Sequence, residues 1–250
     1  MSQYEVIAYR LKDFVQNIKL YFNRSGNEVI YDKRNIIKVI DYEYGRYVVK
    51  AFKVPHLLNQ FVYRFFRDSK AKRSFLNAQR LQLMGIETPQ PVGYIEFPTM
   101  FRFKESFYIS EFFDFDFEIR AVLTDRSFAE RDKILRAFAA YTYKLHKKGV
   151  YHVDYSPGNI LVKKEGTQYR FSIVDVNRMQ FLDMDAKLRM ESLAKLTDNR
   201  EDNLKIVTYY AEVSGESTDT LMGYLEDALQ AQQRYLERKR RWKRLLKRER

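Results

Sequence analysis

Apolar residues in the first 112 positions gather in short runs that are rich in β-branched and aromatic side chains. Such runs, when turn residues bound them, are typical of β-strands, and they occupy residues 28–31, 36–40, 47–52, 91–96 and 106–112. A short segment that contains Gly45 separates the second run from the third, which favours a hairpin turn. The N-terminal part of the chain is therefore predicted to form an antiparallel sheet.

Two segments show the apolar spacing of three to four residues that is typical of amphipathic helices. The first covers residues 57–84 and is followed by Gly85, and the second covers residues 127–148 and is followed by Gly149. Glycine at such a position is a common helix stop, and Ser127 is a candidate N-cap for the second helix. We expect one main helix among the strands and one long helix after them.

The rest of the C-terminal part combines one hairpin with helices. Residues 160–174 resemble two strands that turn at Glu165–Gly166, and the chain beyond them has a mostly helical pattern. The order of elements predicts an α+β fold. We expect residues 1–110 to form an antiparallel sheet with one main helix, and residues 111–250 to form a mostly helical second part.

Composition places the chain among globular proteins, because 45% of its residues are apolar and 16% are aromatic. No run approaches the eighteen apolar residues that a membrane-spanning helix requires, and the first residues lack the pattern of a signal peptide. The absence of cysteine excludes a disulfide framework, a thiolate nucleophile and a cysteine metal site. A cytoplasmic location fits this composition.

The net charge of +12 is concentrated at the C-terminus, where residues 234–250 contain ten Lys or Arg and two Glu, a net +8. Such a charge indicates an anionic partner: nucleic acid, phospholipid headgroups or a phosphorylated glycan. Residues 221–250 read as one long helix that carries Trp242 and several leucines. The helix could lie on an anionic membrane, contact glycolipid phosphates or remain solvated. No recognisable nucleic-acid module accompanies the charge, which argues against nucleic acid.

The residues with the clearest chemistry lie in the segment 151–161. Asp154 follows His152 by two residues, Asn159 follows Asp154 by five, and Asp175 ends a strand-like run further along. Phosphoryl transfer from ATP requires a carboxylate that accepts the proton of the acceptor hydroxyl. It also requires an asparagine and a second carboxylate that hold the metal ion. The segment 151–161 resembles the catalytic loop of protein kinases, and the segment that ends at Asp175 resembles their metal-binding motif.

Each of these residues also has a simpler interpretation. Asp154 could cap a turn, Asn159 could form a local turn after Pro-Gly, and Asp175 could merely end a strand. Taken together, these simpler interpretations leave the order and spacing of the set unexplained. We therefore favour Asp154 as the catalytic residue, Asn159 and Asp175 as ligands of Mg²⁺, and a structural role for His152.

A kinase also needs a lysine on a strand of the N-terminal part to bind the phosphates. Lys50 is our first candidate and Lys53 the second, and strand alternation places the two on opposite faces. Either lysine could instead face solvent. The first strands lack a Gly-x-Gly-x-x-Gly loop, and Asp68 is the only acidic residue between positions 51 and 86.

That near absence of acidic residues removes the glutamate that usually pairs with the kinase lysine. Asn77, Gln79 or Gln82 could position the lysine without a charge. A chain with these gaps could also be a pseudokinase that binds a membrane or protein partner through its basic tail.

Four segments carry a resemblance to a known family: residues 69–75, 84–91, 152–161 and 174–178. They resemble the bacterial lipopolysaccharide core kinases, the Kdo/heptose kinase family within the protein-kinase-like superfamily, and the similarity extends over residues 30–185. The resemblance implies a bilobal protein-kinase-like fold with a nucleotide-binding N-lobe. Asn177, which stands where protein kinases keep glycine, departs from the protein-kinase pattern.

The resemblance further implies transfer of the γ-phosphate of ATP to a sugar hydroxyl of the lipopolysaccharide core, at the cytoplasmic face of the inner membrane. It assigns catalysis to Asp154, Mg²⁺ to Asn159 and Asp175, ATP to Lys50, and the hinge beside adenine and ribose to Glu111. No Ala-Pro-Glu signature is present, which favours a glycan acceptor. A protein or small-molecule kinase of the same superfamily is the enzymatic alternative.

Overall fold

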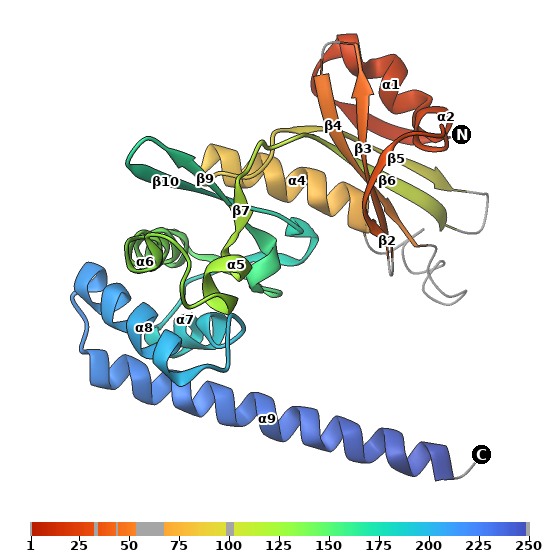
Figure 1. Ribbon diagram of the computed structural model, residues 1–250. Helices are drawn as coiled ribbons and strands as arrows, with labels where there is room; N and C mark the ends of the chain where they lie inside the picture. The colour runs from red at the N-terminus through yellow and green to blue at the C-terminus, as the bar shows by residue number, and fades with distance from the viewer. Residues whose placement is uncertain (1, 33–34, 44, 54–67, 99–102, 249–250) are drawn as a thin grey trace. The chain divides into compact units, whose positions relative to one another are not determined.

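The computed structural model describes two compact units (Figure 1). The described residues are 2–32, 35–43, 45–53, 68–98 and 103–248. The first unit contains residues 1–115 together with 172–178, and the second contains residues 116–171 together with 179–250. The short return segment 172–178 therefore belongs to the first unit, although the chain on either side of it belongs to the second.

The first unit is built on a six-stranded antiparallel sheet with the strand order β1-β5-β6-β4-β3-β2. The predicted antiparallel sheet is thus confirmed. The strands are β1 (Gln3–Val6), β2 (Glu28–Asp32), β3 (Asn35–Tyr42), β4 (Gly45–Phe52), β5 (Pro91–Pro98) and β6 (Phe103–Glu111). Strand β4 is paired on both sides, by β3 and β6, so its backbone is hydrogen-bonded along both edges.

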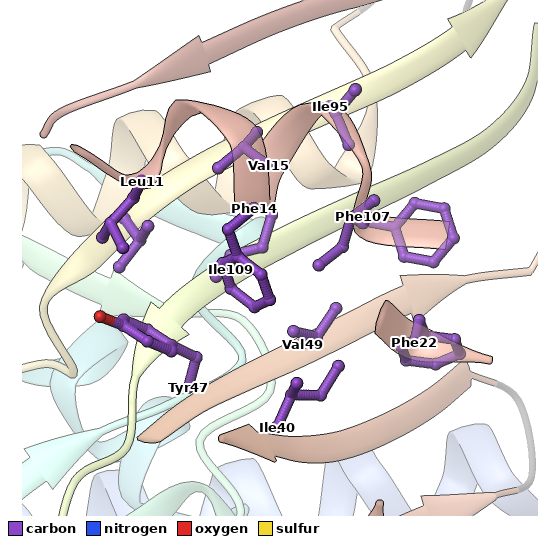
Figure 2. Close-up of a cluster of buried hydrophobic side chains, with 12 residues drawn as sticks. Leu11, Phe14, Val15, Phe22, Ile40, Tyr47, Val49, Ile95, Phe107 and Ile109 are labelled. Atoms are coloured by element: carbon purple, nitrogen blue, oxygen red, sulfur yellow. The ribbon is translucent and has the colours of Figure 1, made fainter. Parts of the chain in front are cut away.

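One face of this sheet is covered by short helices that the sequence analysis did not foresee. They are η1 (Tyr9–Leu11), α1 (Lys12–Gln16) and α2 (Ile18–Phe22). Their buried side chains follow a helical spacing and pack against β3 to β6 in the cluster drawn in Figure 2. The helical members of this cluster are Leu11, Phe14, Val15, Ile18 and Phe22.

The opposite face of the sheet packs against α4 (Lys70–Leu83), which is the main helix expected in this part. Ser69 caps it by accepting a hydrogen bond from the Lys72 amide at 3.0 Å. Phe75 packs against Phe52 and Tyr94 of the sheet. The helix begins only after Ser69, which is extended, so it starts later than the predicted position 57. Residues 57–67 of the predicted helix lie outside the described residues.

The second unit is mostly helical. Its helices are α5 (Ile119–Thr124), α6 (Arg131–Lys147), α7 (Ala186–Leu193), α8 (Arg200–Ser214) and α9 (Thr218–Arg248). Its short strands are β7 (Phe117–Glu118), β8 (Val150–His152), β9 (Ile160–Glu165) and β11 (Met179–Phe181), and β10 (Gln168–Ile173) completes the predicted hairpin with β9.

The predicted start of the long helix at Ser127 is wrong. Helix α6 begins at Arg131, after Glu130 in a left-handed conformation with φ 54°. Ser127 instead donates from its backbone N–H and its hydroxyl to the Asp125 carboxylate, at 2.9 and 2.7 Å. Local bonds of this kind compete with helix formation, and they delay the helix here.

Helix α9 leaves the body of its unit (Figure 1). Its first turns pack on α7 and α8 through the buried residues Leu221, Met222 and Leu225. From Gln230 to Trp242 every residue is exposed. Within the described ranges, no helix combines the length and the apolarity that crossing a bilayer demands.

Candidate active site

Lys50 and Asp175 form an ion pair in the first unit. Lys50 lies in β4 on the face that α4 covers, and its Nζ is 2.5 Å from Oδ1 of Asp175. The two side chains are only 11% and 32% exposed. Asn177 donates from Nδ2 to the same oxygen, also at 2.5 Å. Burial raises the pKa of Tyr108, which lies opposite Lys50 on β6, and the carboxylate paired with the lysine is that of Asp175.

The Asp175 backbone has an uncommon conformation. Its φ is 57°, in the left-handed region that only a few non-glycine residues adopt. The chain just before it is fixed at Ile173, whose N–H donates to the Glu87 carbonyl at 3.0 Å and whose carbonyl accepts from the Thr88 hydroxyl at 2.7 Å. These bonds hold the turn that presents the Asp175 carboxylate to Lys50.

The two other predicted nucleotide contacts lie apart from this pair. Lys53 is exposed just beyond the end of β4, and its backbone N–H donates to Asn35 at 3.5 Å. Glu111 is the last residue of β6 and donates from its N–H to the Gln90 carbonyl at 2.9 Å. A pocket of about 590 Å³ includes Glu111, but it includes neither lysine.

The segment that contains Asp154 lies in the second unit, between β8 and β9. Buried His152 accepts a hydrogen bond at Nδ1 from the Asp154 amide, at 3.0 Å, so it shapes the loop. The Asp154 carbonyl accepts from the Ser156 amide and from Nδ2 of Asn159, both at 2.8 Å. The Asp154 side chain is exposed, as a group that must meet an acceptor hydroxyl requires.

Two further contacts, through Tyr155 and Gly158, hold the loop that contains Asp154. The Tyr155 hydroxyl bonds to Thr142 of α6 at 2.8 Å, and both residues are buried. The guanidinium of Arg120 lies so close to Gly158 that a Cβ at that glycine would be 1.9 Å from Nη2. The sequence analysis did not single out Arg120, and the only local signal for such an approach is the glycine itself.

Each unit contains one oxygen donor of a kind that magnesium binds. Asp175 of the first unit provides a carboxylate, and Asn159 of the second unit, which uses Nδ2 to bind Asp154, retains its amide oxygen as an acceptor. Mg²⁺ prefers oxygen ligands and commonly takes one or two carboxylates plus substrate phosphates. Within the described part of the chain, no group of three or more His, Asp or Glu side chains could hold a metal by itself.

These residues fall within a match to a known family. The model of the lipopolysaccharide kinase (Kdo/WaaP) family matches residues 38–210, which include every candidate from Lys50 to Asp175. The chain belongs to the lipopolysaccharide kinase (Kdo/WaaP) family. The recognition made from the sequence is confirmed, and the protein is a phosphotransferase that acts on lipopolysaccharide. No match was found among curated proteins.

A solved structure similar to this lipopolysaccharide kinase, that of WaaP, confirms the predicted protein-kinase-like α+β fold. WaaP in complex with acyl carrier protein has a TM-score of 0.61 at 16% identity, over 94% of this chain and 98% of that one. WbdD bound to a kinase inhibitor has a TM-score of 0.46 at 14% identity, over 80% and 44%. The Mycobacterium tuberculosis PknI kinase domain has a TM-score of 0.41 at 13% identity, over 78% and 77%.

Proposed function

We propose that this kinase transfers the γ-phosphate of ATP to a sugar hydroxyl of the lipopolysaccharide core or of a related envelope glycan. The observation that carries the proposal is the 2.5 Å pair of Lys50 and Asp175. A lysine and a carboxylate lie side by side there, within the region that the family model matches, which supports a role of the first with phosphate and of the second with a metal ion. These are the two groups that a kinase needs around the phosphates.

Each residue then has a role in the reaction. Asp154 positions the acceptor hydroxyl and takes its proton as the oxygen bonds to phosphorus and ADP leaves. Asn159 and Asp175 hold Mg²⁺, and Lys50 orients the phosphates. Bound Mg²⁺-ATP supplies the phosphoryl group and neutralises its charge. Glu111 contributes to the adenine and ribose side, and Lys53 is the second candidate for the phosphates.

The two parts of the chain would divide this work. Residues 1–110 form the nucleotide-binding lobe, and residues 111–250 form the lobe that carries the catalytic loop, part of the metal site and the basic C-terminal helix. A sugar acceptor is favoured over a protein because the chain has no Ala-Pro-Glu signature. Comparing transfer to core oligosaccharide with transfer to protein substrates distinguishes the two.

The decisive variant is Asp154→Asn, which keeps the size of the side chain and removes the proton acceptor. We expect the rate of phosphate transfer from ATP to core oligosaccharide to fall by ~10²–10⁴-fold, the usual worth of a general base. The melting temperature should not change, because the Asp154 side chain is exposed. Asp183→Asn, at another exposed position of the same unit, is the matched control. Transfer near the wild-type rate by Asp154→Asn would refute the assignment.

We also propose that the basic arm, residues 234–250, brings the enzyme to the anionic inner face of the inner membrane, on the cytoplasmic side. With 100° between successive residues of a helix, Tyr235, Leu236 and Trp242 lie within one third of the circumference. Arg234 and Arg241 lie on the opposite side, Arg238 lies between the two sides, and Lys239 lies within the apolar third, with its Nζ 5.9 Å from the centre of the Tyr235 ring. All of these residues are exposed. A helix that exposes aromatic and apolar side chains among many basic ones suits an anionic lipid surface.

Vesicle sedimentation tests the arm. Wild type should bind vesicles with phosphatidylglycerol and release them in salt, since each basic residue contributes about 1 kcal/mol near such a surface. Changing Arg238, Arg240 and Arg241 to Ala should abolish binding. Changing Lys144, Lys147 and Lys187, which are exposed elsewhere in the unit, should not. Equal binding to uncharged vesicles, or retention by the arginine variant, would refute the proposal.

A further inference from the structure

Helix α4 contains no acidic residue between Lys70 and Leu83. In protein kinases the strand lysine pairs with a glutamate on the helix that packs on the sheet, and this ion pair helps to assemble the site. Here the carboxylate that pairs with Lys50 is that of Asp175, a proposed metal ligand. The helix must therefore be coupled to the site by something other than charge.

The structure provides such a coupling at Asn77. This half-buried residue lies in the middle of α4, and its Nδ2 donates to the carbonyl oxygen of Val176 at 2.7 Å. Val176 directly follows Asp175 and begins the short helix η3 (Val176–Arg178). The bond thus joins α4 to the backbone immediately after the proposed metal ligand.

With this bond, the Asp175 turn is fixed on both of its sides. Glu87 and Thr88 bond to Ile173 before it, and Asn77 bonds to Val176 after it. A left-handed conformation at a non-glycine residue is unfavourable and persists only where the surroundings enforce it. Without Asn77, the following side of the turn would lose this hydrogen bond from α4.

The other two amides of α4 do not reach this turn. Gln82 donates to the Gln90 side chain at 2.5 Å, and Gln79 is half-buried on the same helix. From the sequence, all three amides are candidate substitutes for a charged partner of Lys50. The structure distinguishes Asn77 from the others and gives it a different target, the backbone after Asp175.

We propose that Asn77 is a positioning residue, which fixes the Asp175 carboxylate for Mg²⁺-nucleotide through an uncharged link from α4. This inference rests on the proposed role of Asp175 as a metal ligand. The link leaves Lys50 with a carboxylate partner that also belongs to the metal site. The nucleotide phosphates would therefore bind Lys50, and Mg²⁺ would bind Asp175, in place of the ion pair between these two residues. Helix α4 would hold the turn in place while this happens.

The test is the rise in melting temperature on titration with Mg²⁺ at a fixed, saturating concentration of a non-hydrolysable ATP analogue. Asn77→Leu keeps the approximate size of the side chain and has a higher helix propensity than asparagine, but it cannot donate a hydrogen bond. We expect its half-saturating Mg²⁺ concentration to rise about five- to tenfold, as for one lost hydrogen bond. Gln79→Leu, at the neighbouring half-buried position, should titrate like wild type. Asn77→Ala replaces the leucine variant if added bulk prevents folding.

Asp175→Ala separates the two possible failures. If Asp175→Ala still shows the full Mg²⁺-dependent rise, the proposed function fails at its metal site. If Asp175→Ala abolishes the rise while Asn77→Leu titrates like wild type, the proposed function stands and the positioning role is refuted. A lower melting temperature of Asn77→Leu without any shift in half-saturation refutes it too, because such a result shows a structural contact only.

Discussion

We predict that the buried His146 makes the second unit less stable in mild acid than at neutral pH. This residue of α6 is 3% exposed, and its Nδ1 lies 3.1 Å from the hydroxyl of Tyr210. Burial lowers the pKa of the imidazole to about 3, and the nearby cations Arg189 and Lys195 act in the same direction. The ring is therefore neutral in the folded protein at any pH near neutrality.

The sign of the effect follows from the two states. The pKa of histidine is about 6.5 in an unfolded chain, so below that pH the unfolded chain binds a proton that the folded protein does not. Stability contributed by the neutral ring is complete above that pKa and falls as the pH drops toward about 3. At about 1.4 kcal/mol per pH unit, the loss between about pH 7.5 and pH 5 is ~2 kcal/mol.

His146→Asn tests this value, because asparagine keeps a polar atom near the position of Nδ1 and cannot be protonated. The free energy of unfolding is measured by urea titration at both pH values for both proteins. Wild type should lose about 2 kcal/mol more than the variant between them. Hydrogen bonds lower the pKa of Asp125, Glu130 and Asp132. Protonation of these carboxylates in acid lowers the free energy of unfolding equally in both proteins.

An equal loss in the two proteins would refute the reasoning, since it would mean that His146 gains no proton on unfolding. A lower stability of the variant at both pH values would not refute the reasoning. The missing ring leaves a void, and the free energy lost through that void does not depend on pH.

Two further changes in the second unit test buried polar contacts. Arg131→Met removes the partner of Asp202, in a pair 2.6 Å apart with side chains 12% and 3% exposed; we expect a loss of ~3–5 kcal/mol in urea unfolding. Arg126→Met, which removes the exposed ion pair with Glu201, should lower the free energy of unfolding by less than ~1 kcal/mol. Equal losses for the two variants would contradict the importance of burial. Thr142→Val leaves the buried Tyr155 hydroxyl without its partner and should cost ~1–3 kcal/mol, whereas unchanged stability would count against that bond.

The sequence by itself determined the elements whose signals are local. Strands β3 and β4, the hairpin that turns at Gly166 and the helix that ends before Gly149 all follow from alternation, helical spacing and turn residues. The loop around Asp154 could also be recognised, because its chemistry depends on side chains within a few positions of one another.

The short helices near the N-terminus show where local reasoning ended. Their apolar positions, from Leu11 to Phe22, do follow a helical spacing. Helices α1 and α2 have five residues each and η1 has three, so all are too short to be stable alone. Packing against the sheet therefore makes them helical.

Only the tertiary structure decided how the site of the first unit is assembled. Alternation placed Lys50 and Lys53 on opposite faces of a strand, but it could not tell which face α4 would cover. Lys50 and Asp175 are separated by 125 positions, and Asn77 and Val176 by 99. Contacts of this kind depend on which faces pack together, because the order of neighbouring residues carries no information about a partner so far along the chain.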